Sequence, residues 1–154
     1  MNRGHQLVVF TLDEQRYAVA LSAVQRIVRM VEITPVPHTP EIVLGVINVH
    51  GWIVPVVNFR RRFRLPEREL HPSDQLLIAH TLRRPVALVI DAVIEVITLA
   101  EQDVIAGEKI LPHLEYVAGV VKRADGLILI HDLDRFLSLD EEHALHDAID
   151  AMDR

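Results

Sequence analysis

The chain has no cysteine among its 154 residues, which excludes disulfide bonds and thiolate chemistry. This absence is typical of proteins from a reducing compartment. Aromatic residues are also scarce, at 5% of the chain, whereas hydrophobic residues together make up 50%. Valine, isoleucine and leucine must therefore fill the interior. A chain of this length is long enough for one domain with one or two small cores.

Long apolar runs are absent as well. No stretch approaches the roughly 20 residues of a membrane-spanning helix, because charged or turn residues interrupt each one. The N-terminal region also lacks the pattern of a signal peptide, since the apolar residues 7–12 lead directly into Asp13 and Glu14. We therefore expect a cytoplasmic protein that does not insert directly into a membrane.

An excess of positive charge is missing too. The net charge is −6 and the isoelectric point is about 5.8. Binding of nucleic acid without sequence preference needs a basic face that displaces counterions, so we expect no nucleic-acid partner. Residues 60–64, Arg60-Arg-Arg-Phe-Arg64, form one local basic cluster. We interpret it as the charged face of a short helix, with a contact for an acidic partner as the alternative.

Motifs of catalysis are also lacking. No serine has the strand–turn–helix setting of a nucleophile, and no glycine run matches a phosphate-binding loop. The tightest histidine group is His143 and His146 with Asp147, whose spacing zinc sites can use, but its acidic setting favours a solvated helix face. The pair His131 and Asp132 favours packing at a strand end. We therefore predict no enzyme, and no catalytic, cofactor-binding or metal site.

What the chain does contain is an internal repeat. Residues 45–63 recur loosely as residues 119–137, at a constant offset of 74. A weaker similarity relates residues 18–28 to residues 87–97, at an offset of 69. The change of offset places a five-residue insertion between the two blocks of the second copy. Such a repeat predicts two similar lobes.

Short β-strands bounded by turn residues are expected along most of the chain. They are residues 7–12, 17–21, 44–49, 52–57, 76–80, 86–90, 93–98, 117–122 and 126–131. Many short strands with turn signals favour closed barrels over a parallel sheet. Pro55 is tolerated only at a sheet edge or a bulge, so we expect residues 52–57 to be peripheral, where a partner could dock. Trp52, the only tryptophan, indicates either a partly buried core residue or an interface anchor.

Three short helical segments are also predicted. Residues 23–28 have the spacing of one helical turn, and residues 59–65 that of a short helix. Residues 138–152 begin with the capping-box sequence Ser138-Leu-Asp-Glu141 and continue with an apolar stripe. We expect this last segment to be an amphipathic helix that faces solvent.

Several motifs follow one another along the chain: Val24 and Ile27, residues 34–40, Gly45-Val-Ile-Asn48, residues 51–60, residues 89–93 and residues 126–130. Together they resemble the CheW family of bacterial chemotaxis adaptors. The resemblance runs from about residue 7 to residue 137. It implies a mainly β fold of two intertwined five-stranded SH3-like β-barrels in a single domain, residues 1–154. We expect approximate lobes at residues 17–80 and at residues 81–137 plus 7–16, followed by the helix 138–152.

The resemblance also implies a function. The family's members are non-enzymatic scaffolds that couple the cytoplasmic tip of chemoreceptors to the CheW-like regulatory domain of a CheA-type histidine kinase. Such an adaptor would need no cofactor, would be recruited to the inner face of the membrane through receptor arrays, and is compatible with weak self-association. Two alternatives stay open: a nucleic-acid-binding SH3-like or OB-like barrel, and an adaptor of a system that controls pili or another non-flagellar output.

Receptor contact in the family lies near the cleft between the lobes. The resemblance implies these receptor-facing candidates: Val24, Arg26, Ile27, Gly45, Val46, Asn48, His50, Gly51, Trp52 and Gly119. Two of them depart from the family's usual pattern, which has Arg at the position of His50 and Glu at the position of Arg26. We therefore expect receptor specificity to differ from that of ordinary members.

Overall fold

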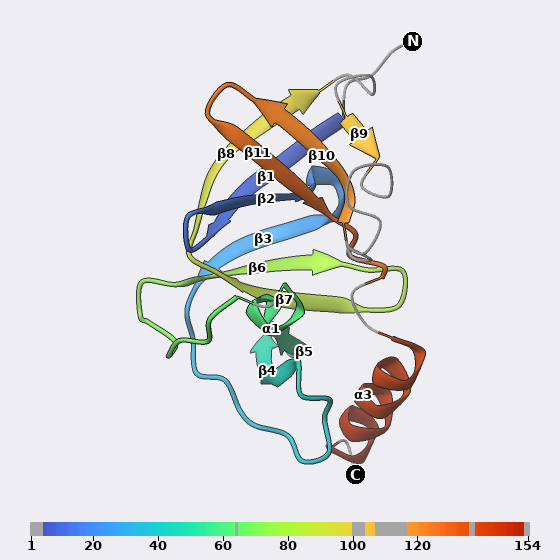
Figure 1. The fold of residues 1–154 in the computed structure, drawn as a ribbon. Helices are drawn as coiled ribbons and strands as arrows, with labels where there is room; N and C mark the ends of the chain where they lie inside the picture. Colours follow the sequence, from blue (N-terminus) through green and yellow to red (C-terminus); the bar gives the residue numbers. More distant parts are fainter. Residues whose placement is uncertain (1–4, 64, 100–103, 107–116, 136–137, 153–154) are drawn as a thin grey trace.

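Short strands dominate the computed structural model, which describes residues 5–63, 65–99, 104–106, 117–135 and 138–152 (Figure 1). The strands are β1 (His5–Leu12), β2 (Gln15–Ala20), β3 (Val24–Arg29), β4 (Val43–Val49), β5 (Trp52–Val57), β6 (Gln75–His80), β7 (Pro85–Ile90), β8 (Ala92–Leu99), β9 (Val104–Ala106), β10 (Val117–Arg123) and β11 (Gly126–His131). The helices are the 3-10 turn η1 (Leu21–Ala23), α1 (Phe59–Arg62) and α3 (Leu139–Met152). Each strand expected from the sequence is present, and β3 and β9 are additions.

The helical turn predicted for residues 23–28 is wrong. Only η1 is helical, and the following six residues form the strand β3. Val24, Ile27 and Val28 are β-branched, and such side chains pack well on a pleated surface but lose rotamer freedom in a helix. Their spacing fits a helical face equally well, so tertiary pairing with β6 decides the conformation.

The strands form two sheets, which Figure 1 shows as the upper and lower parts of the molecule. The six-stranded sheet has the order β8-β1-β2-β11-β10-β9, and the five-stranded sheet has the order β3-β6-β7-β5-β4. The predicted mainly β fold of two SH3-like units is confirmed, although the hydrogen-bonded ladders leave both sheets open in the described residues.

The repeat is visible in the strand register. The hairpins β4–β5 and β10–β11 have identical bounds at an offset of 74, and each has a bulge beside its glycine, Gly45 or Gly119. The turn that follows repeats as well, since Asn58 Oδ1 accepts from the Arg60 N–H and Asp132 Oδ1 accepts from the Asp134 N–H, both at 3.0 Å. The sequence similarity therefore reflects a repeated backbone arrangement.

The other block repeats at an offset of 69. Leu7 pairs with Ala20 in the hairpin β1–β2, and Leu76 pairs with Val89 in the hairpin β6–β7. These two hairpins are exchanged between the copies: β1–β2 joins the strands of the second copy, and β6–β7 joins those of the first. The lobe boundaries expected from the sequence are therefore shifted, because β2 belongs to the six-stranded sheet and β7 to the five-stranded sheet.

The expected peripheral position of residues 52–57 is also wrong. β5 lies between β7 and β4, and β4 is the edge strand. Pro55 is accommodated because the parallel pairing of β5 with β7 involves only Val56 and Val57. A proline cannot donate to a ladder, and on the other side its partner Val46 directs both backbone groups to Thr34 instead.

The largest core cluster lies between the two sheets and includes Phe10, Phe59, Leu77 and Leu88. Helix α3 closes this core with Leu145, whose exposed fraction is 0%. Ser138 and Glu141 form the predicted reciprocal cap, with distances of 2.8 and 3.1 Å. The helix is therefore amphipathic, as predicted, but it does not simply face solvent, since one face is packed into the fold.

Candidate functional site

The candidate residues nearest to one another lie where β3 approaches the turn between β4 and β5. In that turn His50 and Gly51 have φ angles of 51° and 89°, the left-handed pair that a two-residue hairpin turn of type I′ requires. Asn48 Oδ1 accepts a hydrogen bond of 2.8 Å from the Gly51 N–H and stabilises the turn. We call the surface formed by Arg26, His50 and Trp52 the rim.

The rim joins the two edges of the five-stranded sheet. Arg26 on the edge strand β3 lies with its Nη1 2.6 Å from Nε2 of His50, which follows the opposite edge strand β4. A second link lies further along, where Thr34 and Val46 exchange two backbone hydrogen bonds of 2.9 Å each. The two residues that depart from the family pattern are therefore in direct contact.

Trp52 is exposed at the rim. Its exposed fraction is 73%, so the interpretation as a core residue is wrong. Alternation along β5 places Trp52 on the same face as Val54 and Val56, which build a core cluster. At the end of the strand this face opens to solvent, and the indole extends beyond the packed interior.

Five of the other candidates do not join this surface. Val24 and Ile27 pair with Ala79 and Leu77, so they lie on the opposite face of β3 from Arg26, which pairs with Ile78. Gly45 and Val46 are buried in β4, and Gly119 is buried in β10 of the other sheet. These glycines and Val46 position strands and do not offer side chains to a partner.

Gly45 is required by a close backbone approach. A Cβ at this position would lie 2.4 Å from the carbonyl oxygen of Thr34, and the φ angle of 155° disfavours other residues. Val46 is covered by Val36 and by Ala148 of α3. Helix α3 therefore shields part of the surface that the sequence indicated as receptor-facing.

Four exposed apolar side chains form two pairs related by the repeat. Ile27 on β3 and Val96 on β8 are 69 positions apart and 38% and 53% exposed. Ile53 on β5 and Leu127 on β11 are 74 positions apart and 36% and 46% exposed. Only Ile27 was among the candidates chosen from the sequence. The repeat offsets of 69 and 74, added to Ile27 and Ile53, lead to Val96 and Leu127.

The basic cluster around α1 is neutralised within the protein. Arg60 is buried and pairs with Asp13 at 2.8 Å and with Asp91 at 3.0 Å. Arg61 pairs with Glu67 at 2.5 Å, and Arg62 pairs with Glu141 at 2.7 Å. Arg64 lies outside the described residues. The described arginines of the cluster are therefore engaged internally, which removes the basis for a basic docking face.

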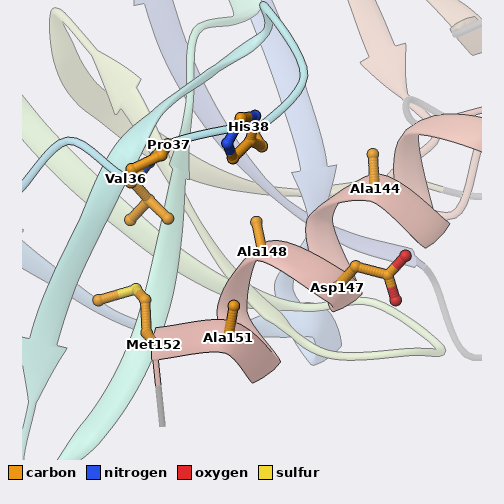
Figure 2. A pocket seen from close by; sticks show the side chains of 8 residues that line it. All are labelled: Val36, Pro37, His38, Ala144, Asp147, Ala148, Ala151 and Met152. Atoms are coloured by element: carbon orange, nitrogen blue, oxygen red, sulfur yellow. The ribbon is translucent and has the colours of Figure 1, made fainter. Parts of the chain in front are cut away.

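A groove of about 580 Å³ lies between α3 and the segment that precedes β4 (Figure 2). Its lining is mostly apolar, and Asp147 and His38 lie at its borders. The residues that line it are Val36, Pro37, His38, Ala144, Asp147, Ala148, Ala151 and Met152. It contains no arrangement of side chains with evident chemistry.

The histidines in the described ranges show no sign of a metal centre. His143 and His146 are exposed on α3, and the described residues contain no group of three or more potential metal ligands. His131 instead stacks on Phe59, with ring centroids 4.1 Å apart, which confirms the predicted packing at a strand end. Burial and the nearby charge of Arg62 lower its pKa to about 3. Among the described residues no helix is long and apolar enough to cross a membrane.

Comparisons with known proteins agree with the fold. The family model described as CheW-like domain matches residues 6–141. Chemotaxis protein CheW from Rhizobium meliloti (strain 1021) is 30% identical over 145 residues, which cover 93% of this chain and 94% of the relative. Chemotaxis protein CheW from Treponema pallidum (strain Nichols) is 29% identical over 142 residues, covering 88% and 84%.

Among solved structures, the crystal structure of scaffolding protein TtCheW from Thermoanaerobacter tengcongensis is similar to this chain. The TM-score is 0.81 and the sequence identity is 30%, with 90% of this chain and 95% of that chain covered. Sequence and backbone therefore lead to the same family.

Proposed function

This chain belongs to the family of CheW-like domains, and from that premise we propose that it is a non-enzymatic scaffold of a chemosensory array. In this proposal it couples the cytoplasmic tip of a chemoreceptor to the CheW-like regulatory domain of a CheA-type histidine kinase. It acts on the cytoplasmic side of the membrane, to which the receptor recruits it. Neither a cofactor nor a metal takes part.

The observation that carries this proposal is the duplication of exposed apolar side chains. Ile27 and Ile53 recur as Val96 and Leu127 in the other sheet, so each sheet presents its own set of exposed apolar side chains. A protein that binds one partner needs only one such surface, whereas a coupling protein needs two. Because the partner's regulatory domain is itself CheW-like, similar barrel surfaces can pack against each other through exposed strands and side chains.

Within this proposal the candidate residues divide into three groups. Arg26, Asn48, His50, Gly51 and Trp52 supply the receptor-facing surface or shape its turn. Val24 and Ile27 lie on the opposite face of β3 from Arg26. Gly45, Val46 and Gly119 are buried and act by fixing strand positions. Weak self-association through the duplicated surfaces belongs to the same proposal, at lower affinity than kinase binding.

The nucleic-acid alternative has less support. The described arginines of the α1 cluster are paired with carboxylates, and the net charge of −6 repels a polyanion. Whether the array controls flagella, pili or another system depends on the partner proteins and not on the surface of this chain.

Calorimetric titration of the full chain with the regulatory domain of the kinase encoded beside it tests the proposal. We expect binding that depends only modestly on salt, because the duplicated surfaces are apolar. The variant Val96→Asp should weaken it, while Leu82→Asp, at an exposed leucine in the β6–β7 turn, serves as the control. Lack of binding to either the kinase domain or the receptor fragment would refute the adaptor function.

A further inference from the structure

Within the described part of the chain, the cation at the rim has no carboxylate partner. Arg26 donates to His50, and because arginine only donates, Nε2 of His50 must be the acceptor and its ring must be neutral in this contact. Arg26 therefore keeps its full positive charge. Among the residues that the structure describes, no carboxylate forms an ion pair with Arg26, in contrast to the arginines of α1.

The hydrogen bond with His50 fixes the position of this charge. A guanidinium has five N–H groups, and the contact with His50 uses one side of it. The bulge of β3 lies between Val24 and Arg26, directly before this residue. Bulges re-aim side chains, and here the bulge and the histidine together hold an exposed arginine at the end of the sheet.

The exposed indole lies on the same side of the sheet. Val28 packs against the core cluster that Val54 and Val56 build, so alternation places Arg26 and Trp52 on this face of their strands. Tryptophan and arginine are the residues most enriched at energetically dominant interface positions, where lysine and glutamate are depleted. An exposed cation and an exposed indole on one face of the sheet have the composition of such a position.

We propose that the rim selects a partner segment in which a carboxylate is followed or preceded by an apolar side chain, the carboxylate binding Arg26 and the apolar group packing on Trp52. The inference rests on the proposed function, in that this segment belongs to the receptor tip. Planar donors suit a carboxylate because two N–H groups can bind its two oxygens. A polyphosphate chain is a poorer occupant, because the protein as a whole carries a net charge of −6.

The test measures binding of the full chain to the cytoplasmic fragment of a receptor encoded with it, by calorimetry at 50 and 300 mM salt. Arg26→Gln retains a donor for His50 but removes the charge, whereas Arg26→Lys retains the charge. We expect Arg26→Gln and Trp52→Ala to weaken receptor binding roughly tenfold, Arg26→Glu to weaken it further, and Arg26→Lys to recover part of the affinity. The salt dependence should be smaller for Arg26→Gln than for the unaltered chain.

Arg83→Glu is the matched control, because Arg83 is exposed in the β6–β7 turn, away from the rim. It should change receptor binding less than twofold, and all rim variants should bind the kinase domain as the unaltered chain does. Thermal melting of each variant separates a loss of folding from a loss of contact. Receptor binding that is unchanged in Arg26→Glu would overturn this inference and leave the adaptor function standing. Absence of receptor binding by the unaltered chain would overturn both, as would binding to a single-stranded oligonucleotide that requires Arg26.

Discussion

Nη2 of Arg60 lies 3.0 Å from Oδ1 of Asp91, the residue at which the chain passes from the five-stranded to the six-stranded sheet. The same guanidinium binds Asp13 in the β1–β2 turn at 2.8 Å. Asp91 also accepts from Arg68, which in turn binds Asp74. Hydrogen bonds from Arg68 and from the His71 N–H outweigh the effect of burial and hold the pKa of Asp74 below its ordinary value. Arg60 is therefore a junction between the two sheets and not a surface charge.

Replacement of Arg60 by methionine should lower the free energy of unfolding by about 2–3 kcal/mol. Loss of one member of a fully buried pair costs about 3–5 kcal/mol, and the cost here is smaller because Asp13 and Asp91 remain in contact with solvent. Arg61→Met is the control, with an expected change within about 0.5 kcal/mol, because its partners are exposed. Urea denaturation measures both, and equal effects of the two variants would contradict the assigned role of Arg60.

Gly45→Ala should destabilise the protein by about 2–3 kcal/mol, because the new methyl group would meet the carbonyl of Thr34 and force the strand apart. Gly126→Ala provides the comparison. Its φ angle of 134° also disfavours alanine, but a Cβ there meets nothing within 4 Å, so the expected loss is only about 1 kcal/mol. Chemical denaturation of the two variants measures the difference. A similar loss of stability in both variants would mean that backbone strain, and not the contact with Thr34, is the reason that position 45 requires glycine.

His131 should make the folded state less stable in mild acid. Its pKa is about 3 in the folded protein, against an ordinary value of 6.5, because burial and Arg62 disfavour the charged ring. Above pH 6.5 the ring is neutral in both states and contributes nothing to the pH dependence. Below that value His131 becomes protonated in the unfolded chain but stays neutral in the folded protein. The free energy of unfolding therefore decreases by up to about 1.4 kcal/mol per pH unit.

The variant His131→Val isolates this effect, because valine occupies the equivalent position of the first copy, Val57. Between pH 6.5 and 4.5 its stability should depend less on pH than that of the unaltered chain. Carboxylates such as Asp74 and Glu141 have lowered pKa values and affect both proteins alike. Parallel stability curves for the two proteins in this range would contradict the prediction.

Leu145→Ala should cost about 3 kcal/mol of unfolding free energy, since the side chain is fully buried in the main core and its removal leaves a cavity. Met152, about two turns further along α3, is exposed, and Met152→Ala should change stability by less than about 1 kcal/mol. Thermal and urea denaturation provide the comparison. A helix that merely faced solvent would show no difference between the two positions.

Local patterns predicted most of the strands, because alternation and turn residues are properties of short segments. The repeat also predicted the matching hairpins, since the offset between Gly45 and Gly119 holds through the strand register. The prediction of a helical turn at residues 23–28 was wrong because a short β-branched segment fits both the helical and the strand periodicity. Only pairing with β6 decides between them. The sequence did not predict the burial of Leu145, because an apolar stripe does not reveal how deeply a helix packs into the core.

The candidate site was predicted in part. The sequence placed Arg26 and His50 in one functional region through family resemblance, but their direct contact depends on how β3 and β4 approach each other from opposite edges of the sheet. It also grouped Ile27 with Arg26, although neighbouring residues of a strand point to opposite faces. The ion pairs of buried Arg60 join residues up to 47 positions apart, so a local charge pattern cannot predict them.

The exchanged hairpins have a consequence for the order in which the protein can be assembled. The hairpin β1–β2 emerges first from the ribosome, but its neighbours in the sheet, β8 and β11, are synthesised much later. Likewise, the sheet that contains β3, β4 and β5 is incomplete until β6 and β7 have been synthesised. A nascent chain that ends in the loop after α1 can complete neither sheet. Two fragments divided in that loop would each carry strands that the other requires, so they should recover the native sheets only when both are present.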